Sequence, residues 1–260
     1  LNVVFIPSVT GLGYIFNSKS LKSLIIKTLI KPLFKKALSD CKTIALFENP
    51  SDLTTYVKQG ITTSDRSAVL PISGVDTEAY TPKSKYTKNN GSIIVLMASR
   101  LLRDKGVLEY DKAATTILKQ NQAVEFWLAG GEDAANPSAL NNRELISIKQ
   151  KGALNLLGHQ DDLPKIIHQA DIAVLPSYHE GLSRFLLMSA SAGLPIITTD
   201  IPGNHTLISN NKNGILIPIK DPDALAKAIR GLITNASERE NLGTAIRKTV
   251  VEKFDSKLIL

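Results

Sequence analysis

The sequence predicts an α/β protein built around a doubly wound parallel sheet. Short β-branched and apolar runs alternate with helix-like stretches along the 260 residues, and some runs, such as 92–99, are continuously apolar. A continuously apolar strand is typical of a parallel sheet covered on both faces, and strand–helix alternation builds such a sheet. The length fits one complete domain with part of a second.

The first part of the chain shows this alternation in a short form. Strands are expected at 1–7, 43–49 and 66–72. Helices are expected at 19–38, where Pro32 interrupts the pattern, and at 50–60. The polar, turn-rich stretch 82–92 is the expected linker.

The second part repeats the alternation more clearly. Strands are expected at 92–99, 123–130, 153–159, 171–177, 194–200 and 213–219. Helices are expected at 106–120, 144–152, 162–170, 183–193, 221–235 and 236–254. Ser183 and Asp221 are expected N-caps and Gly193 a C-cap, because short polar side chains and glycine favour those positions.

Composition narrows the class of partner. The chain carries 31 Lys and Arg against 24 Asp and Glu, a net charge of +7, which favours anionic partners. A single cysteine, Cys41, excludes an internal disulfide and fits a reducing compartment. No apolar run reaches the length of a spanning helix, and no signal-peptide pattern stands at the start. We therefore expect a cytoplasmic protein.

Two cations follow the strand expected at 92–99. Arg100 stands at the end of the strand and Lys105 at the start of the next helix. Ligands of parallel sheets bind beyond the carboxyl ends of the strands, and cations beside a helix N-terminus suit a diphosphate. The alternative is a solvated basic turn in which Arg103 and Asp104 pair with neighbours.

A carboxylate and a glycine follow the strand expected at 171–177. Glu180 could accept hydrogen bonds from sugar hydroxyls, and Gly181 would let the backbone approach a ligand. The alternative is a capping carboxylate beside a turn glycine. The four histidines, at positions 159, 168, 179 and 205, show no metal-ligand spacing, so no metal site is expected.

An ordered series of segments then makes the interpretation specific. The segments are ISGVDTEAY, ASRLLRDKG, VEFWLAGG, LLGHQDDL, ADIAVLPSYHEGLSRFLLMSASAGLPIITTD, PGN and NGILIP. In this order the chain resembles family 4 glycosyltransferases of the GT-B fold, over nearly its whole length and most strongly from 72 to 218. The resemblance implies that 1–82 is the remainder of an N-terminally truncated acceptor-side domain and 83–260 the donor-binding domain, both Rossmann-like.

The resemblance implies a hexosyltransferase-type reaction. A retaining enzyme would move a sugar from a nucleotide-diphospho-sugar to a saccharide or lipid-linked acceptor, in cell-surface polysaccharide or lipopolysaccharide assembly, with no metal or other cofactor. Arg100 and Lys105 would hold the diphosphate and stabilise the departing charge, with Glu180 beside the donor sugar. The rest of the implied donor-binding set is Gly158, His159, Tyr178, Gly181, Leu182 and Met188.

Three departures from the family pattern bear on activity. Met188 stands where the family has a second Glu that grips the ribose hydroxyls, and Met cannot accept those bonds usefully. Ser189 is the neighbouring hydroxyl that could compensate in part. Ile72 replaces a small residue, and the Gly-rich loop expected early in the acceptor-side domain is absent; the turn at Gly11 to Gly13 is too short to count.

Residues 21–38 predict a basic helix with an apolar stripe. Lys27, Lys31 and Lys35 share one face, and Ile25, Leu29 and Leu33 share another. Such a helix can lie on an anionic membrane surface, which would place the protein at the inner face of the cell membrane. The alternative is a solvated face above a stripe packed on the core.

Three other functions stay open. A GT-B enzyme that isomerises or phosphorolyses sugars is one, and the opening segment TGLGY argues against it. A degenerate, non-catalytic nucleotide-sugar-binding protein is another, which Met188 and the missing segment favour. A nucleic-acid binder is the third, and no binding motif or set of stacking aromatic residues supports it.

Overall fold

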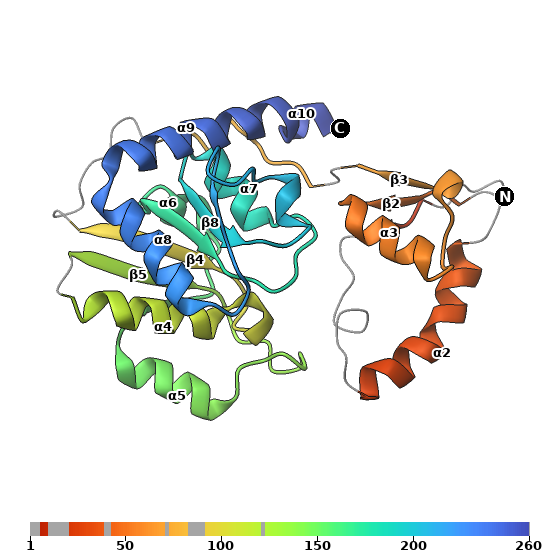
Figure 1. Cartoon of the computed structure of the whole chain (residues 1–260), viewed down its shortest axis with the longest axis horizontal. Helices are drawn as coiled ribbons and strands as arrows, with labels where there is room; N and C mark the ends of the chain where they lie inside the picture. Colours follow the sequence, from red (N-terminus) through yellow and green to blue (C-terminus); the bar gives the residue numbers. More distant parts are fainter. Residues whose placement is uncertain are drawn as a thin grey trace.

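The computed structural model describes residues 6–9, 21–38, 43–70, 73–82, 92–120 and 123–259, which form a small and a larger α/β unit side by side (Figure 1). The strand expected at 1–7 lies almost wholly outside the described residues. The same holds for Gly11 to Gly13, Ile72 and most of the linker 82–92.

The small unit has a parallel sheet of three short strands. Their order is β1 (Ser8–Val9), β2 (Ala45–Phe47) and β3 (Ser67–Val69). Its helices are α2 (Leu21–Leu38) and α3 (Pro50–Lys58), with a 3₁₀ turn, η1 (Ser64–Arg66), before β3. The core is small and includes Phe47 and Tyr56, whose rings meet edge to face. Contrary to the expectation, α2 continues through Pro32, so the lost backbone donor does not end the helix.

The larger unit has a parallel sheet of six strands in the order β6-β5-β4-β7-β8-β9. Their bounds are β4 (Ile93–Ala98), β5 (Val124–Ala129), β6 (Asn155–Gly158), β7 (Ile172–Leu175), β8 (Ile196–Thr199) and β9 (Ile215–Ile217). All residues of β7 and β8 are buried, and so are the four central residues of β4. Burial on both faces confirms that these apolar runs belong to the middle of a covered parallel sheet.

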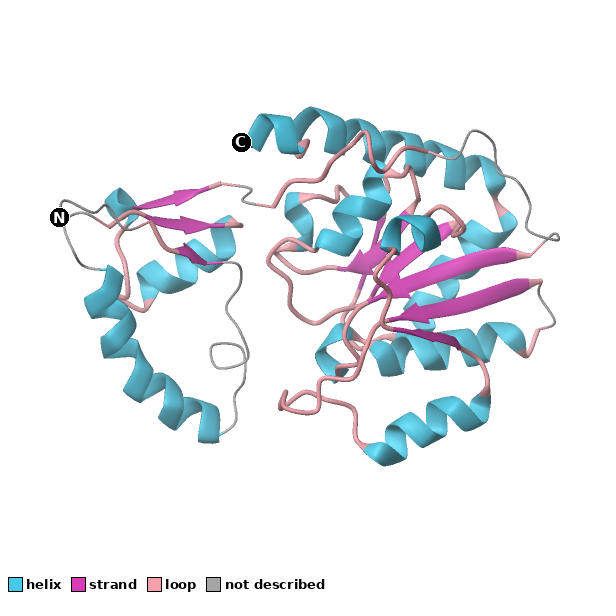
Figure 2. Cartoon of the chain, turned by 180° about the vertical axis from the view of Figure 1, so that it is seen from behind, coloured by secondary structure: helices cyan, strands magenta, loops and turns pink. Residues whose placement is uncertain are grey.

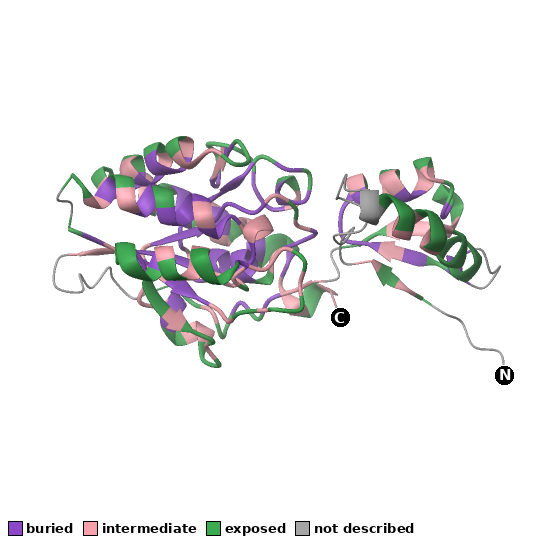
Figure 3. Cartoon of the chain, turned by 90° about the horizontal axis from the view of Figure 1, so that it is seen from below, coloured by how far each residue is buried: buried purple, intermediate pink, exposed green. Residues whose placement is uncertain are grey.

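Helices lie on both sides of the larger sheet (Figure 2). Their bounds are α4 (Val107–Leu118), α5 (Asn142–Lys151), α6 (Leu163–Ile167), α7 (Arg184–Ser191), α8 (Pro222–Thr234), α9 (Ala236–Lys253) and α10 (Ser256–Ile259), with 3₁₀ turns η2 (Arg103–Lys105) and η3 (Asn204–Thr206). The sheet is buried between helices whose outer faces are exposed (Figure 3). The predicted doubly wound α/β class is confirmed.

Caps account for several helix boundaries. Ser183 and Asp221 cap α7 and α8 as predicted, each accepting a hydrogen bond from a first-turn amide. α5 begins two residues earlier than predicted, because Asn141 and Glu144 form a reciprocal capping box. Within the described residues, no helix has the length and apolarity needed to cross a membrane.

The segment 73–82 follows the small sheet and runs along the larger unit. The Val75 N–H donates to the Phe254 carbonyl at 2.9 Å, and the Val75 carbonyl accepts from the Ser256 N–H at 3.0 Å. The Arg247 guanidinium donates to the Tyr80 carbonyl at 2.9 Å. The end of α9 and the start of α10 are therefore tied to the segment between the two sheets. The predicted boundary between residues 82 and 83 stays a prediction.

Candidate functional site

The strand order of the larger sheet defines where a ligand would bind. β5 and β6 extend the sheet on one side of β4, whereas β8 and β9 extend it on the other side of β7. The crevice beyond the carboxyl ends of β4 and β7 is therefore a topological switch point, where open parallel sheets bind their ligands. Two of the predicted segments, 100–105 and 178–182, leave these two strands.

A tight turn after β4 positions the predicted cations. Lys105 ends η2 and Gly106 links η2 to α4 with φ of 77°. A Cβ on Gly106 would lie 2.2 Å from the carbonyl oxygen of Pro176, so the turn packs directly on the loop after β7. Only glycine fits both the left-handed backbone and this approach.

The two loops meet in an ion pair. Lys105 Nζ lies 2.7 Å from Glu180 Oε1, and their side chains are 22% and 9% exposed. Arg100, whose side chain is 59% exposed, lies 2.6 Å from Asp133 Oδ2. The structure thus brings the predicted cation and the predicted carboxylate together at the switch point, while Arg100 stands at its open edge.

Arg103 fits the structural alternative considered for this turn. Its guanidinium binds both carboxylate oxygens of Glu144, at 2.8 and 2.5 Å, and donates to the Ala139 carbonyl. Desolvation raises the pKa of Glu144, but the hydrogen bonds that its carboxylate accepts from Arg103 and from the Asn141 backbone N–H, together with the charge of Arg103, outweigh it and lower the pKa. Arg103 therefore anchors η2 to α5 rather than facing the crevice.

The loop 178–182 packs closely against Gly203. A Cβ on Gly203 would lie 1.9 Å from the carbonyl oxygen of Glu180 and 2.7 Å from that of Gly181. Gly181 and Leu182 are buried, and Ser183 then caps α7. The PGN segment at 202–204 therefore forms the surface on which the Glu180 backbone packs.

A cavity of about 250 Å³ opens beside Arg100. Its lining residues are Ala98, Ser99, Arg100, Ala129, Gly130, Gly131, His159, Gln160 and Leu163. A Cβ on Gly130, where φ is 145°, would lie 1.7 Å from the Ser99 carbonyl oxygen, so glycine keeps β4 and β5 close at this end. His159 lines the cavity, whereas Gly158 is not among the lining residues and accepts a hydrogen bond from the Gly130 N–H at 2.7 Å.

Tyr178 and His179 directly precede Glu180 in the loop after β7, with Tyr178 partly buried and His179 exposed. The Tyr178 hydroxyl donates to Glu109 Oε1 at 2.7 Å, and Lys220 Nζ lies 5.0 Å from the centre of its ring. Burial, and then the Glu109 carboxylate, raise the pKa of Tyr178 well above its usual value. Burial also lowers the pKa of His179, which favours its neutral form. The Tyr178 side chain is thus engaged in holding α4.

Met188 lies apart from the cavity. Its side chain is partly buried and packs against the large core, and it is not among the residues that line the cavity. Ser189 is fully buried, and its hydroxyl has no hydrogen-bond partner among the described residues. Ser189 therefore cannot take the place of a missing ribose ligand without rearrangement.

One residue of the small unit also faces this site, and the sequence analysis missed it. Glu48 follows β2, is 2% exposed, and accepts a hydrogen bond from Ser73 Oγ at 2.6 Å. Burial raises the pKa of Glu48, while Ser73 and the Leu182 backbone N–H oppose that rise. Its place directly after a buried strand was the available signal.

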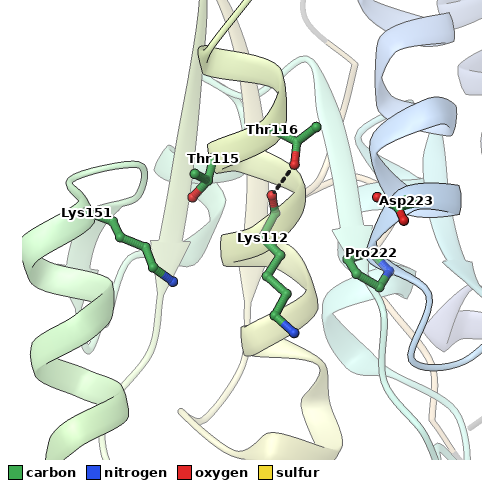
Figure 4. Close-up of a pocket in the computed structure, with 6 residues that line it drawn as sticks. All are labelled: Lys112, Thr115, Thr116, Lys151, Pro222 and Asp223. Atoms are coloured by element: carbon green, nitrogen blue, oxygen red, sulfur yellow. Dashed lines mark hydrogen bonds between the residues drawn. The ribbon is translucent and has the colours of Figure 1, made fainter.

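A second cavity, of about 350 Å³, is less suited to an anion (Figure 4). Lys112 and Lys151 line it, but Lys151 Nζ lies 2.7 Å from Asp111 Oδ2, and Asp223 adds a second carboxylate. The Thr116 hydroxyl donates to the Lys112 carbonyl. Positive charge in this cavity is therefore balanced by carboxylates.

Comparison with known proteins identifies the family. Residues 81–249, well over half of the chain, match the family model described as Glycosyl transferases group 1. The chain belongs to this family. The resemblance found in the sequence is thereby confirmed at the level of group 1 glycosyl transferases.

Individual relatives of this group 1 chain are also named as glycosyltransferases. It is 31% identical over 228 residues to UDP-Gal:alpha-D-GlcNAc-diphosphoundecaprenol alpha-1,3-galactosyltransferase of Escherichia coli, covering 84% of this chain and 57% of that protein. It is 27% identical over 261 residues to N,N'-diacetylbacillosaminyl-diphospho-undecaprenol alpha-1,3-N-acetylgalactosaminyltransferase of Campylobacter jejuni, covering 96% of this chain and 66% of that protein. The chain thus spans less than two thirds of either relative.

A solved structure agrees on the fold. Sucrose-phosphate synthase of Thermosynechococcus elongatus superimposes with a TM-score of 0.81 at 19% identity, covering 100% of this chain and 66% of that one. The architecture is that of GT-B glycosyltransferases, as the sequence predicted.

Proposed function

We propose that this group 1 glycosyl transferase belongs to family 4 and transfers a hexose, with retention, from a nucleotide-diphospho-sugar to a saccharide or lipid-linked acceptor. The observation that carries the proposal is the Lys105–Glu180 pair at the switch point, beside the open Arg100 edge and the 250 Å³ cavity. The expected product belongs to cell-surface polysaccharide or lipopolysaccharide assembly, and both relatives are named for acceptors linked to diphosphoundecaprenol.

The geometry supports distinct roles for these groups. As the bond from the anomeric carbon to the diphosphate oxygen breaks, negative charge grows on the leaving diphosphate. Lys105 and Arg100 would stabilise that charge, since cations aimed at developing charge act mainly in the transition state. Glu180, already oriented by Lys105, would accept hydrogen bonds from the donor sugar, and the cavity lined by His159 and Gly131 would take the base. We propose that no metal is required, so excess EDTA should leave turnover unchanged.

The deciding experiment is transfer of radiolabelled sugar. UDP-, GDP- and ADP-sugars are offered with an undecaprenyl-diphosphate-linked saccharide, and wild type is compared with Arg100→Ala and Lys105→Ala. Turnover with one nucleotide, lost in both variants, is the expected result. Binding of a nucleotide sugar without transfer to any acceptor would favour the second candidate, a degenerate nucleotide-sugar-binding protein, which Met188 supports because its side chain packs on the core.

We propose that α2 contacts an anionic membrane surface and so places the protein at the inner face of the cell membrane. Leu24, Ile25, Leu29 and Leu33 are each more than half exposed along this helix. Exposed apolar area near lysines favours the interfacial region of an acidic bilayer. Lys27 and Lys31 are partly buried, so the apolar residues rather than these lysines dominate the outer face.

Vesicle sedimentation tests this contact. Leu29→Ser/Leu33→Ser should lose binding to acidic vesicles, and Lys27→Glu/Lys31→Glu/Lys35→Glu should weaken it. Equal sedimentation of wild type and both variants would refute the membrane contact and leave the donor site unaffected.

A further inference from the structure

Asn204 is a buried polar residue next to Gly203, on which the Glu180 backbone packs. It is 3% exposed and begins η3. A buried amide without partners would destabilise the fold, so its contacts indicate what holds this turn. The amide nitrogen lies 2.8 Å from Thr198 Oγ1 and 2.9 Å from the Thr199 carbonyl oxygen. Because a carbonyl can only accept, the side-chain NH2 group must face it, which fixes the direction of the amide.

The two threonines connect this amide to the neighbouring strand. Thr198 and Thr199 are the last two residues of β8, and both are fully buried. The Thr198 hydroxyl donates to the Leu175 carbonyl at 2.7 Å, and the Thr199 hydroxyl donates to the Ser177 carbonyl. Leu175 ends β7, and Ser177 stands where the next loop starts. The buried amide is therefore joined, through β8, to the start of that loop.

Gly203 contacts the far end of the same loop. A Cβ at this position would lie 1.9 Å from the Glu180 carbonyl oxygen and 2.7 Å from that of Gly181, so the two backbones are in direct contact. Asn204 follows Gly203 in the chain, and the Asn204 N–H donates to the Ile201 carbonyl at 3.0 Å. A shift of the Asn204 side chain would therefore move the surface on which Glu180 packs.

We propose that Asn204 is a positioning residue for Glu180: its side-chain amide fixes Gly203 relative to the end of β7 and so sets where the carboxylate meets the donor sugar. The inference rests on the proposed function. The turn that carries Lys105 is held by a separate contact, the pairing of Arg103 with α5. Loss of the amide should therefore weaken binding of the sugar more than binding of the diphosphate.

Binding of UDP and of UDP-galactose, measured by calorimetry on the whole chain, tests the proposal. Asn204→Asp keeps the shape of the side chain but replaces the donating NH2 group by an acceptor. UDP-galactose affinity should fall about fivefold or more relative to UDP affinity, which is a part of the ~10–150-fold that a hydrogen bond to a charged acceptor is worth.

Asn213→Asp is the matched control. Asn213 is also buried, and its amide donates to the Leu207 carbonyl and to the Thr249 hydroxyl, both at 3.1 Å. The variant loses a buried amide donor of the same kind, away from the contacts that join β7, β8 and Gly203. It should therefore keep the wild-type ratio of the two affinities even where its stability falls.

A double-variant cycle shows whether Asn204 acts through Glu180. Glu180→Ala removes the carboxylate, so adding Asn204→Asp to it should change UDP-galactose affinity by less than about twofold. If Asn204→Asp does not fold, Thr198→Val removes the hydroxyl that accepts from the amide and should shift the same ratio by a smaller factor.

Two results would overturn the positioning role while leaving the donor site intact. One is a wild-type ratio of the two affinities in the folded Asn204 and Thr198 variants. The other is an equal loss from Asn204→Asp with and without the Glu180 carboxylate. Failure of wild type and of every folded variant to bind millimolar UDP would overturn the donor site as well.

Discussion

Lys105→Met tests the ion pair on which the proposed function rests. The substitution leaves Glu180, a side chain only 9% exposed, without its cation at 2.7 Å. Breaking a buried pair costs ~3–5 kcal/mol and an exposed pair ~0–1 kcal/mol, so a partly buried pair should cost about 1–3 kcal/mol. For a domain of ordinary size this lowers the melting temperature by roughly 2–12 °C.

The double variant Lys105→Met/Glu180→Gln separates stability from binding. Removing the stranded charge should restore most of the lost stability, with a coupling of about 1–2 kcal/mol between the two sites. UDP affinity should not recover, because the diphosphate still lacks its cation; the loss should be about 10–150-fold. Thermal denaturation with and without UDP measures both quantities on the same samples.

Two outcomes would refute this reasoning. Additive losses of stability in the double variant would show that Lys105 and Glu180 are not coupled. Wild-type affinity for UDP in folded Lys105→Met would show that Lys105 does not hold the diphosphate.

Three further substitutions probe the same site. Gly203→Ala should lower stability by about 1–3 kcal/mol and weaken UDP binding, because its Cβ meets the Glu180 carbonyl, whereas Gly231→Ala, with open space at its Cβ, should be neutral or stabilising by denaturation. Met188→Glu should tighten UDP-sugar binding in calorimetry if position 188 reaches the ribose; an unchanged dissociation constant would contradict this. Tyr178→Phe should cost ~1–3 kcal/mol in urea denaturation, because Glu109 loses its hydroxyl donor, and an unchanged midpoint would count against that bond.

The larger unit was predictable because its two central strands, β4 and β7, are continuously apolar. Both faces of β7 and β8 are buried, and this burial appears in the sequence as runs without charged residues. The meeting of Lys105 and Glu180 followed in outline from the rule that parallel strands end at one edge. Their direct pairing, across 75 positions of sequence, did not, since many rotamers satisfy that rule.

The contacts of the small unit were less accessible to sequence reasoning. Its strands are two or three residues long, too short to show a period. Glu48 precedes Asn49 and Pro50, so the local pattern indicates a helix start and hides the long-range bond to Ser73. The depth of Ser189 was also hidden, because one apolar helix face does not show how closely α7 meets the sheet.

The turns at the end of α9 join the segment after the small sheet to the helices that pack beside the loop 178–182. Val75 is hydrogen bonded to the residues on both sides of Asp255, so the segment after the small sheet is fixed to the end of α9. α9 packs on α7, and a Cβ on Gly243 would lie 2.1 Å from the Gly193 carbonyl, which leaves no slack between them. We therefore expect a domain or label fused after α10 to act first on the contacts that join the segment 73–82 to the end of α9.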